Sequence, residues 1–229
     1  MTDAEFITLC LHGDAEKISR AINDGANVNA KTEGGSTALM SAANGGHNEA
    51  TRLLIMHGAD LNAQNVNGYT ALSEAAFWEL AETVRLLMEY GADPDIPTKE
   101  GWTALTLAIQ HNSLNTARVL LEHGANVNAR DNNGLTALRY ARSPKAVRLL
   151  ADYGADLNAR DSNGDTALMW AVLSGNYGIA EELLRHCADV NAKDNNGWTA
   201  LMFAERLGDG RLARLLRENG AKKIALPIR

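Results

Sequence analysis

Six glycines, each followed two residues later by Thr-Ala-Leu, divide the 229-residue chain at a nearly constant pitch. Their successive spacings are 33, 33, 33, 30 and 33 residues, and they are Gly35, Gly68, Gly101, Gly134, Gly164 and Gly197. A second series, of Gly-Ala pairs, keeps step with the first. A period of roughly 20–50 residues indicates a stack of similar units rather than one closed globule. A stack has a long exposed surface and no enclosed cleft, which favours binding over catalysis.

The unit at residues 101–133 predicts two short helices followed by a loop. Thr103 has the chemistry of an N-cap, because its hydroxyl can accept a hydrogen bond from the first turn. Asn112 and Ser113 separate two apolar runs, and Gly124 lies where a helix C-terminus needs a positive φ. Residues 131–134 are turn formers that suit a hairpin-like loop. Since neither helix exceeds about three turns, each unit must bury its Ala and Leu face against its neighbours.

These units resemble the ankyrin repeat, whose motif reads roughly G-x-T-P-L-H-x-A-A, then a second helix with Leu-Leu, then G-A-D-V-N. The opening motif begins at each of the six glycines, and Gly58-Ala59-Asp60-Leu61-Asn62 is one of the closing runs. The resemblance covers essentially the whole chain and implies an all-α solenoid of helix-turn-helix units joined by hairpin-like loops. We expect a single domain over 1–229, with an N-cap repeat at 1–34, internal repeats at 35–67, 68–100, 101–133, 134–163 and 164–196, and a C-cap repeat at 197–229.

The chain departs from the family pattern at two motif positions. The Pro is Ala in all six copies, and the His is replaced by Met40, Ser73, Thr106, Arg139, Met169 and Met202. Because that His normally makes hydrogen bonds between loops in the family, we expect looser coupling between the loops here.

Two irregularities mark the later repeats. The repeat at 134–163 is three residues short, and Ser143-Pro144 has the pattern of an N-cap followed by the first helical residue. The shortening should pull in the turn between its helices and notch that edge of the array. Cys187 stands where the other repeats have the glycine after the second helix, so we expect a strained left-handed residue there, at a cost of roughly 1 kcal/mol.

Charge and cysteine content limit the partners and the compartment. The net charge of −6 argues against nucleic acid, which requires a basic face. Residues 205–229 nevertheless carry seven Lys or Arg against three acidic residues, so this end is either a solvated face or a dock for an acidic partner. Two cysteines far apart in a linear array form no disulfide framework, which predicts a reducing, cytoplasmic setting. The acidic N-terminus is no secretory signal, and no apolar stretch predicts membrane insertion.

The sequence motifs indicate a protein that is neither catalytic nor metal-binding. The sequence contains no CxxC, HExxH, P-loop or GxSxG motif. His57, His123 and His186 share one repeat position, but a spacing of about 10 Å between stacked helices would keep them apart. We therefore expect no enzyme activity, no cofactor and no metal site.

In ankyrin arrays, partners usually lie in a groove formed by the loop tips and inner helices, and the variable positions of that groove carry over to this chain. Four aromatic residues in the repeats at 68–100 and 101–133 are expected to project from neighbouring positions. Large exposed apolar patches usually mark interaction sites, and Trp and Tyr are frequent hot spots. The predicted partner-binding residues are Tyr69, Phe77, Trp78, Trp102, Gln110, His111, Leu135 and Trp198. A third inner-helix position, occupied by Leu107, Tyr140, Trp170 and Phe203, is expected to be core.

The preferred interpretation is a non-catalytic module that binds a protein partner in its concave groove, as scaffold, adaptor or inhibitor, and is itself a monomer. One alternative is a regulatory ankyrin domain of a larger enzyme or channel, against which the caps at both ends and the Met1 start argue. Another is an engineered ankyrin binder, which the regular pitch allows. The short fifth repeat and Cys187 argue against that alternative.

Overall fold

The computed structural model describes residues 1–222, and the chain divides into two compact units at residues 126 and 127. The first unit runs from Met1 to Asn126, and the second contains the described residues from Val127 onward. Each unit is a stack of helix pairs joined by extended loops, so the all-α repeat architecture predicted from the sequence is confirmed.

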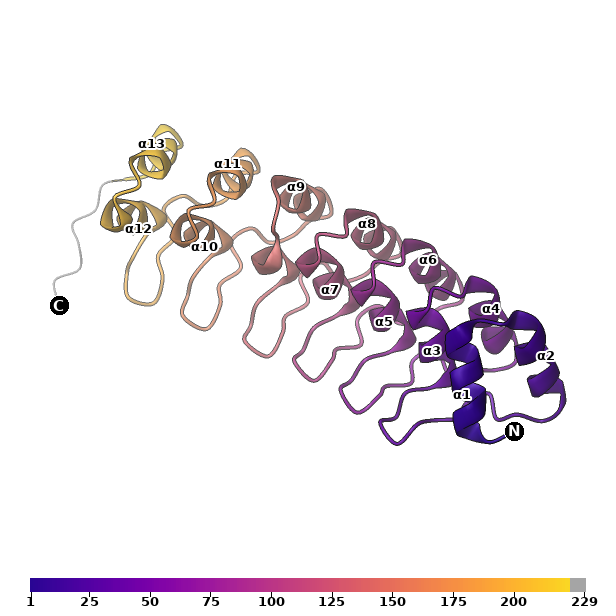
Figure 1. Cartoon of the computed structure of the whole chain (residues 1–229). Helices are drawn as coiled ribbons and strands as arrows, with labels where there is room; N and C mark the ends of the chain where they lie inside the picture. The colour runs from indigo at the N-terminus through magenta and orange to yellow at the C-terminus, as the bar shows by residue number, and fades with distance from the viewer. Residues whose placement is uncertain (223–229) are drawn as a thin grey trace. The chain divides into compact units, whose positions relative to one another are not determined.

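Helices of the first unit form two rows (Figure 1). In the inner row, α1 contacts α3, α3 contacts α5, and α5 contacts α7, while α2, α4, α6 and α8 follow one another in the outer row. The loops extend beyond the inner row. The bounds are α1 (Asp3–His12), α2 (Ala15–Asn23), α3 (Ala38–Asn44), α4 (Asn48–Met56), α5 (Ala71–Phe77), α6 (Ala81–Glu89), α7 (Ala104–Gln110) and α8 (Leu114–Glu122).

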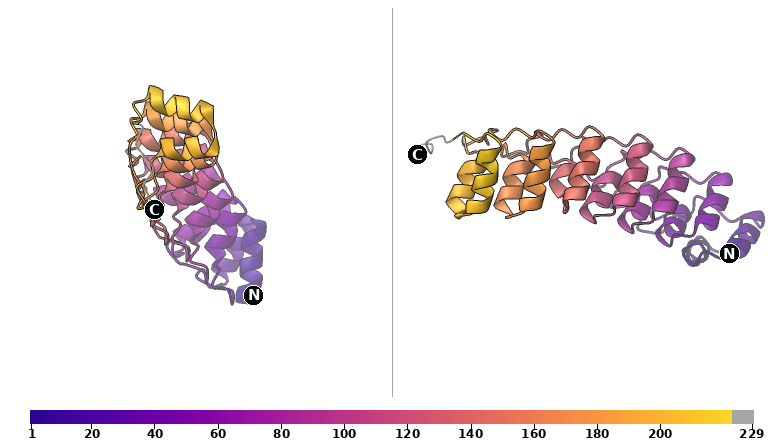
Figure 2. Two further views of the ribbon diagram at one scale, coloured as in Figure 1. Left: turned by 90° about the vertical axis from the view of Figure 1, so that its left-hand side faces the viewer. Right: turned by 90° about the horizontal axis from the view of Figure 1, so that it is seen from above.

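The second unit repeats this arrangement with one irregular element. Its inner row is η1, α10 and α12, and its outer row is α9, α11 and α13. The right-hand view of Figure 2 shows successive helices within each unit lying side by side. The bounds are η1 (Ala137–Tyr140), α9 (Pro144–Asp152), α10 (Ala167–Leu173), α11 (Tyr177–Arg185), α12 (Ala200–Leu207) and α13 (Gly210–Glu218).

The predicted threonine caps begin most of the inner helices. The hydroxyl of Thr103 accepts a hydrogen bond from the backbone N–H of Thr106 at 3.4 Å, and Thr70 accepts one from Ser73 at 3.2 Å. Equivalent bonds begin α3, α10 and α12, whereas Thr136 makes no such bond at the start of η1. The Thr-Ala-Leu signature therefore sets the first residue of each regular inner helix.

A repeating leucine and alanine core holds the rows together. Each outer helix from α4 to α13 contributes one leucine whose exposure is 0%, and these are Leu54, Leu87, Leu120, Leu150, Leu183 and Leu216. Alanines such as Ala42 and Ala75 are buried equally completely on the inner helices. Because alanine adds little bulk, the short inner helices can pack closely. None of the helices in the described part of the chain is long and apolar enough to cross a membrane.

Asparagine side chains, and an aspartate in one repeat, link successive loops four residues after the glycine, or Cys187 in one repeat, that follows each outer helix. Asn29 donates to the carbonyl of Gly58 at 3.1 Å and accepts from the N–H of Asp60 at 2.8 Å. In the second unit Asn128 makes the matching bonds to Gly154 and Asp156, at 3.2 and 2.8 Å. We call this series, Asn29, Asn62, Asp95, Asn128, Asn158 and Asn191, the asparagine ladder.

The loops are thus connected without the family histidine, and the expectation of looser coupling than in the family pattern stays a prediction. Long side chains add further links. Gln64 donates to the carbonyls of Gly68 and Pro97, both at 2.9 Å, and Arg130 donates to those of Gly134 and Arg160 at 2.7 and 2.9 Å. These side-chain links between loops could not be read from the repeat motif.

The short fifth repeat and Cys187 behave as predicted. Ser143 caps α9 by accepting from the N–H of Ala146 at 3.2 Å, and Pro144 is the first helical residue. The first helix of that repeat is reduced to the four-residue 3₁₀ helix η1. Cys187 has a φ of 66° and is exposed, whereas Cys10 is fully buried.

Candidate functional site

The tips of the hairpin loops are fixed by side chains that bind the backbone of their own loop. Asn65 accepts from the N–H groups of Asn67 and Tyr69, at 2.9 and 3.0 Å. Asp194 accepts in the same way from Asn196 and Trp198, at 2.8 and 2.7 Å. Each loop-tip residue predicted to bind a partner therefore projects from a turn of defined geometry rather than from a free loop.

Phe77 lies at the centre of an aromatic cluster in the first unit. It is the last residue of α5, and its ring makes edge contacts with Tyr69 at 6.4 Å, Trp78 at 5.2 Å and His111 at 4.8 Å between centroids. Edge-to-face pairs of this kind contribute about 0.5–1.5 kcal/mol each beyond the area they bury. We call these four residues the aromatic face. It joins the inner-helix ends of two successive repeats.

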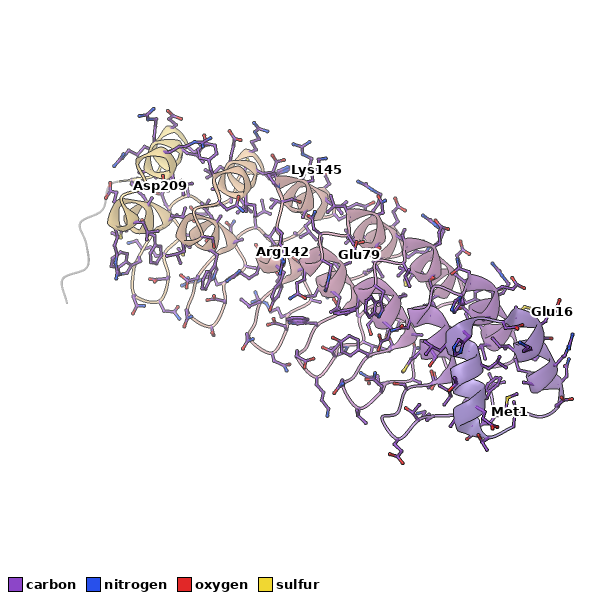
Figure 3. The ribbon with its side chains drawn as sticks, viewed as in Figure 1. Met1, Glu16, Glu79, Arg142, Lys145 and Asp209 are labelled. Carbon is purple, nitrogen blue, oxygen red and sulfur yellow. The ribbon has the colours of Figure 1, made fainter. Side chains whose placement is uncertain are left out.

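Trp78 is an exposed member of the aromatic face, with 54% of its surface accessible. It is the C-cap of α5, and the next residue, Glu79, has a φ of 62°; the matching turns hold Asn112, with a φ of 57°, and the glycines Gly46 and Gly175. Figure 3 labels Glu79. A left-handed non-glycine residue costs roughly 1–2 kcal/mol, and such strain is concentrated at functional sites. One turn therefore combines an exposed tryptophan with a strained backbone.

Acidic groups lie next to the aromatic face. Glu74, on α5, accepts from the side-chain amides of Asn44 at 3.2 Å and Asn65 at 3.5 Å, and burial raises its pKa. Burial also raises the pKa of the Tyr69 phenol, and the negative charges of Glu100 and Glu74 raise it further. The face therefore offers aromatic surface within a negative local field.

The other predicted residues lie in both units. In the first unit, Trp102 is half-buried at a loop tip and Gln110 is half-buried as the last residue of α7, next to His111. In the second unit, Leu135 is half-buried, and Trp198 stacks on Phe203 at 5.2 Å between centroids with an interplanar angle of 26°. Ring contacts thus bring three of the other seven predicted residues, Tyr69, Trp78 and His111, against Phe77.

The expectation that the third inner-helix position is core is correct only for Leu107. Leu107 is fully buried, but Tyr140, Trp170 and Phe203 are half-buried. The Tyr140 hydroxyl donates to Asp131, and the Trp170 indole N–H donates to Asp161 at 3.0 Å. A polar atom on each of these two rings therefore reaches the loop, which leaves part of the ring at the surface.

Sequence reasoning missed a cation–aromatic pair in the second unit. The guanidinium carbon of Arg139 lies 3.9 Å from the ring centroid of Trp170. Arg139 had been noted only as a replacement for the family histidine. The available signal for this pair is a positive side chain at that motif position in the repeat that lacks three residues.

Basic side chains of the last described repeat are also engaged. Arg206 lies over Trp198 at 5.3 Å, Arg211 lies over Tyr177 at 3.8 Å, and Arg217 pairs with Glu205 at 2.6 Å. Lys223 and Arg229, which contributed to the predicted basic end, lie outside the described residues. The dock for an acidic partner predicted there stays untested.

Within residues 1–222, no cluster of three or more His, Cys, Asp or Glu side chains has a metal-binding arrangement. His57 and His123 each contact a carbonyl of their own helix, on Leu53 and Val119, at 2.8 Å through Nδ1. His186 lies 3.4 Å from the carboxylate of Glu182. Each of the three histidines therefore contacts a group of its own helix.

Comparison with known proteins decides the family. The family model for ankyrin repeats, described as Ankyrin repeats (3 copies), matches residues 6–98, 90–161 and 142–225. The chain belongs to the ankyrin-repeat family. Among solved structures, it is similar to the crystal structure of the ankyrin repeat domain of Bcl-3, titled a unique member of the IkappaB protein family. That match has 28% sequence identity and a TM-score of 0.86, and it covers 93% of this chain and 97% of the other.

A comparison with curated proteins gives no significant match. Ankyrin repeats are generally protein-interaction modules and typically not enzymes. The chain has the fold of such a module.

Proposed function

We propose that the chain is a non-catalytic interaction module that holds a protein partner against the inner helices and loop tips of its first unit. The aromatic face carries this proposal. Exposed clusters of Trp, Tyr and Phe are costly to leave in water and are enriched among binding hot spots. Trp78, exposed and contacted by Phe77, is the expected anchor.

The surroundings of the aromatic face support a partner with apolar and basic groups. Glu74 and Glu100 place negative charge near Tyr69. Trp102 and Gln110, at a loop tip and an inner-helix end of the same unit, would extend the contact surface. Leu135 and Trp198 occupy the equivalent positions in the second unit and would contact a partner long enough to reach them.

The same proposal includes the type of partner, the oligomeric state and the cellular compartment. The partner would be a protein rather than nucleic acid, and the chain would act as a monomeric scaffold, adaptor or inhibitor. The thiols of Cys10 and Cys187 are both free, which fits a reducing cytoplasmic compartment. The seven predicted repeats would form one functional domain, with no catalytic role and no cofactor.

The test compares partner capture by three forms of the chain. Affinity capture from source lysate is followed by quantitative mass spectrometry, using the native chain, the double variant Phe77→Ala/Trp78→Ala and the control Tyr90→Ala. Tyr90 is a 38% exposed aromatic residue at the C-cap of α6, in the outer row. Circular dichroism establishes that all three are folded.

A specific partner should be retained by the native chain and by the Tyr90 variant, and it should be lost by the double variant. Because a hot-spot residue contributes about 2 kcal/mol or more, the affinity should fall at least about thirtyfold. Equal retention by all three forms would show that the aromatic face is packing rather than a binding site.

A further inference from the structure

A cleft of about 200 Å³ lies beside η1 in the second unit, with α10 and the start of α11 forming its other side. It follows from the short fifth repeat. The inner helix α10 has seven residues, but η1 has four, and the chain leaves it in an extended conformation at Ala141. The missing helical turn leaves space that a regular repeat would fill, so the notch predicted from the sequence is present.

Two arginines line this cleft, and no carboxylate does. Arg139 is half-buried against the Trp170 ring, and its Nε is buried without a hydrogen-bond partner. Arg142 is exposed, and Figure 3 labels it where the chain passes from η1 towards α9. Among the described residues, neither guanidinium lies within ion-pair distance of an acidic side chain.

The remaining walls supply neutral donors and an apolar floor. Asn176 accepts from the N–H of Ile179 through Oδ1 at 3.2 Å, and this leaves its amide NH₂ available to donate. Ser174 adds a hydroxyl. Leu138 and Ile179 line the apolar part and are almost fully buried. The cleft therefore presents hydrogen-bond donors above an apolar base.

Two carboxylates near Arg139 belong to a smaller neighbouring pocket. Asp161 accepts from the Trp170 indole and from the N–H groups of Asn163 and Asp165, so it is occupied in fixing the loop and the ring. Burial raises the pKa of Asp165, and the charge of Asp161 raises it further. Burial lowers the pKa of Arg139, while the charges of Asp161 and Asp165 act in the opposite direction and only partly offset this effect.

We infer that this cleft binds an acidic side chain, Asp or Glu, of a protein partner, with an aliphatic neighbour of that side chain against Leu138 and Ile179. A carboxylate accepts charge-assisted bonds from guanidinium groups, and arginine is suited to this recognition. The cleft volume of about 200 Å³ equals that of several water molecules, since liquid water occupies about 30 Å³ per molecule. This space is enough for one such side chain. This inference shares one assumption with the proposed function, namely that the ligand is a segment of a protein.

The test uses peptides of matched sequence and the Trp170 indole as reporter. The probe is the acetylated and amidated peptide Leu-Glu-Glu-Leu, with Leu-Gln-Gln-Leu as its uncharged counterpart. The Trp170 indole N–H resonance is assigned by its loss in Trp170→Phe. Its shift is followed through each titration up to 10 mM peptide, a concentration that sets the weakest affinity the titration can define. The acidic peptide should shift it saturably, and the uncharged peptide should bind about tenfold more weakly.

Variants separate the cleft from general electrostatic attraction. Arg142→Gln should weaken binding about tenfold, through loss of a charge-assisted bond, and Arg139→Lys should weaken it similarly while keeping the charge. Lys145→Gln is the control, because Lys145 is an exposed cation at the start of α9 that does not line the cleft (Figure 3). It should change the affinity by less than about twofold.

Several results would overturn the inference. No saturable shift at 10 mM peptide, or equal effects of the Arg142 and Lys145 variants, would show that the cleft does not recognise the peptide. A shift by inorganic phosphate matching that by the peptide would make the cleft a site for small oxyanions. The Phe77→Ala/Trp78→Ala variant should bind the acidic peptide normally, so failure of the aromatic face and failure of the cleft are distinguished.

Discussion

Replacing Gly68 by alanine should destabilise the protein far more than the same change at Gly91. Both glycines have left-handed backbones, with φ of 80° and 87°. They differ in what an added methyl group would meet. At Gly68 a Cβ would lie 2.8 Å from the backbone nitrogen of Lys99 and 2.9 Å from two backbone atoms of Thr98, whereas at Gly91 nothing lies within 4 Å.

The two costs can be estimated separately. The left-handed conformation costs any non-glycine residue roughly 1–2 kcal/mol, and this applies equally at both positions. At Gly68 the methyl would in addition push the next loop away and stretch the bond from the Lys99 N–H to the Asn67 carbonyl, now 3.0 Å. Overpacking typically costs about 1–3 kcal/mol. We therefore expect about 1–2 kcal/mol for Gly91→Ala and about 2–5 kcal/mol for Gly68→Ala.

Urea unfolding followed by circular dichroism measures both values. Amide hydrogen exchange at Lys99 provides a local readout, and its protection should fall in the Gly68 variant but not in the Gly91 variant. Equal destabilisation of the two variants, within about 0.5 kcal/mol, would refute the argument that the loops touch at Gly68.

Three further predictions concern single positions. Cys187→Gly should raise the Tm by about 2–4 °C, because it removes roughly 1 kcal/mol of left-handed strain; an unchanged or lower melting temperature would contradict this. Glu182→Gln should cost about 1 kcal/mol at pH 7 and less at pH 2, because Arg148 lowers the pKa of Glu182. The carboxylate's contribution is present above its ordinary value of 4.5 and is lost as pH falls through the lowered pKa, which urea unfolding at both pH values measures. Asn29→Asp should cost about 0.5–1.5 kcal/mol in thermal or urea unfolding, since it keeps the acceptor for Asp60 but loses the donor to Gly58; a fully stable variant would show that this half of the ladder is dispensable.

Local rules predicted the fold well because each repeat follows the same short-range logic. The hydroxyl of a threonine, a run of alanine and leucine, and a glycine with positive φ define each helix pair without reference to distant residues. The same reasoning placed Ser143 at the start of α9 and Cys187 in the left-handed region. These features depend on neighbours within a few positions in the sequence.

Contacts between repeats were harder to predict from the sequence. The asparagine ladder links residues about 31 positions apart, whereas in the sequence Asn62 is only the last residue of a closing motif. The stacking of Arg139 on Trp170 joins residues of two successive repeats, one of them on the shortened helix η1. The assignment of Trp170 to the core failed for the same reason, since its indole N–H reaches the loop at Asp161.

The contrast between the two thiols gives the native chain a selective chemical handle. Thiol reagents attack the thiolate, and burial raises the pKa of Cys10 to about 12, so that side chain is both enclosed and protonated at neutral pH. Cys187 is exposed at the end of α11. A maleimide fluorophore should therefore attach at one position without any engineered cysteine, and its signal would report on partner binding and unfolding in the second unit of an otherwise unaltered protein.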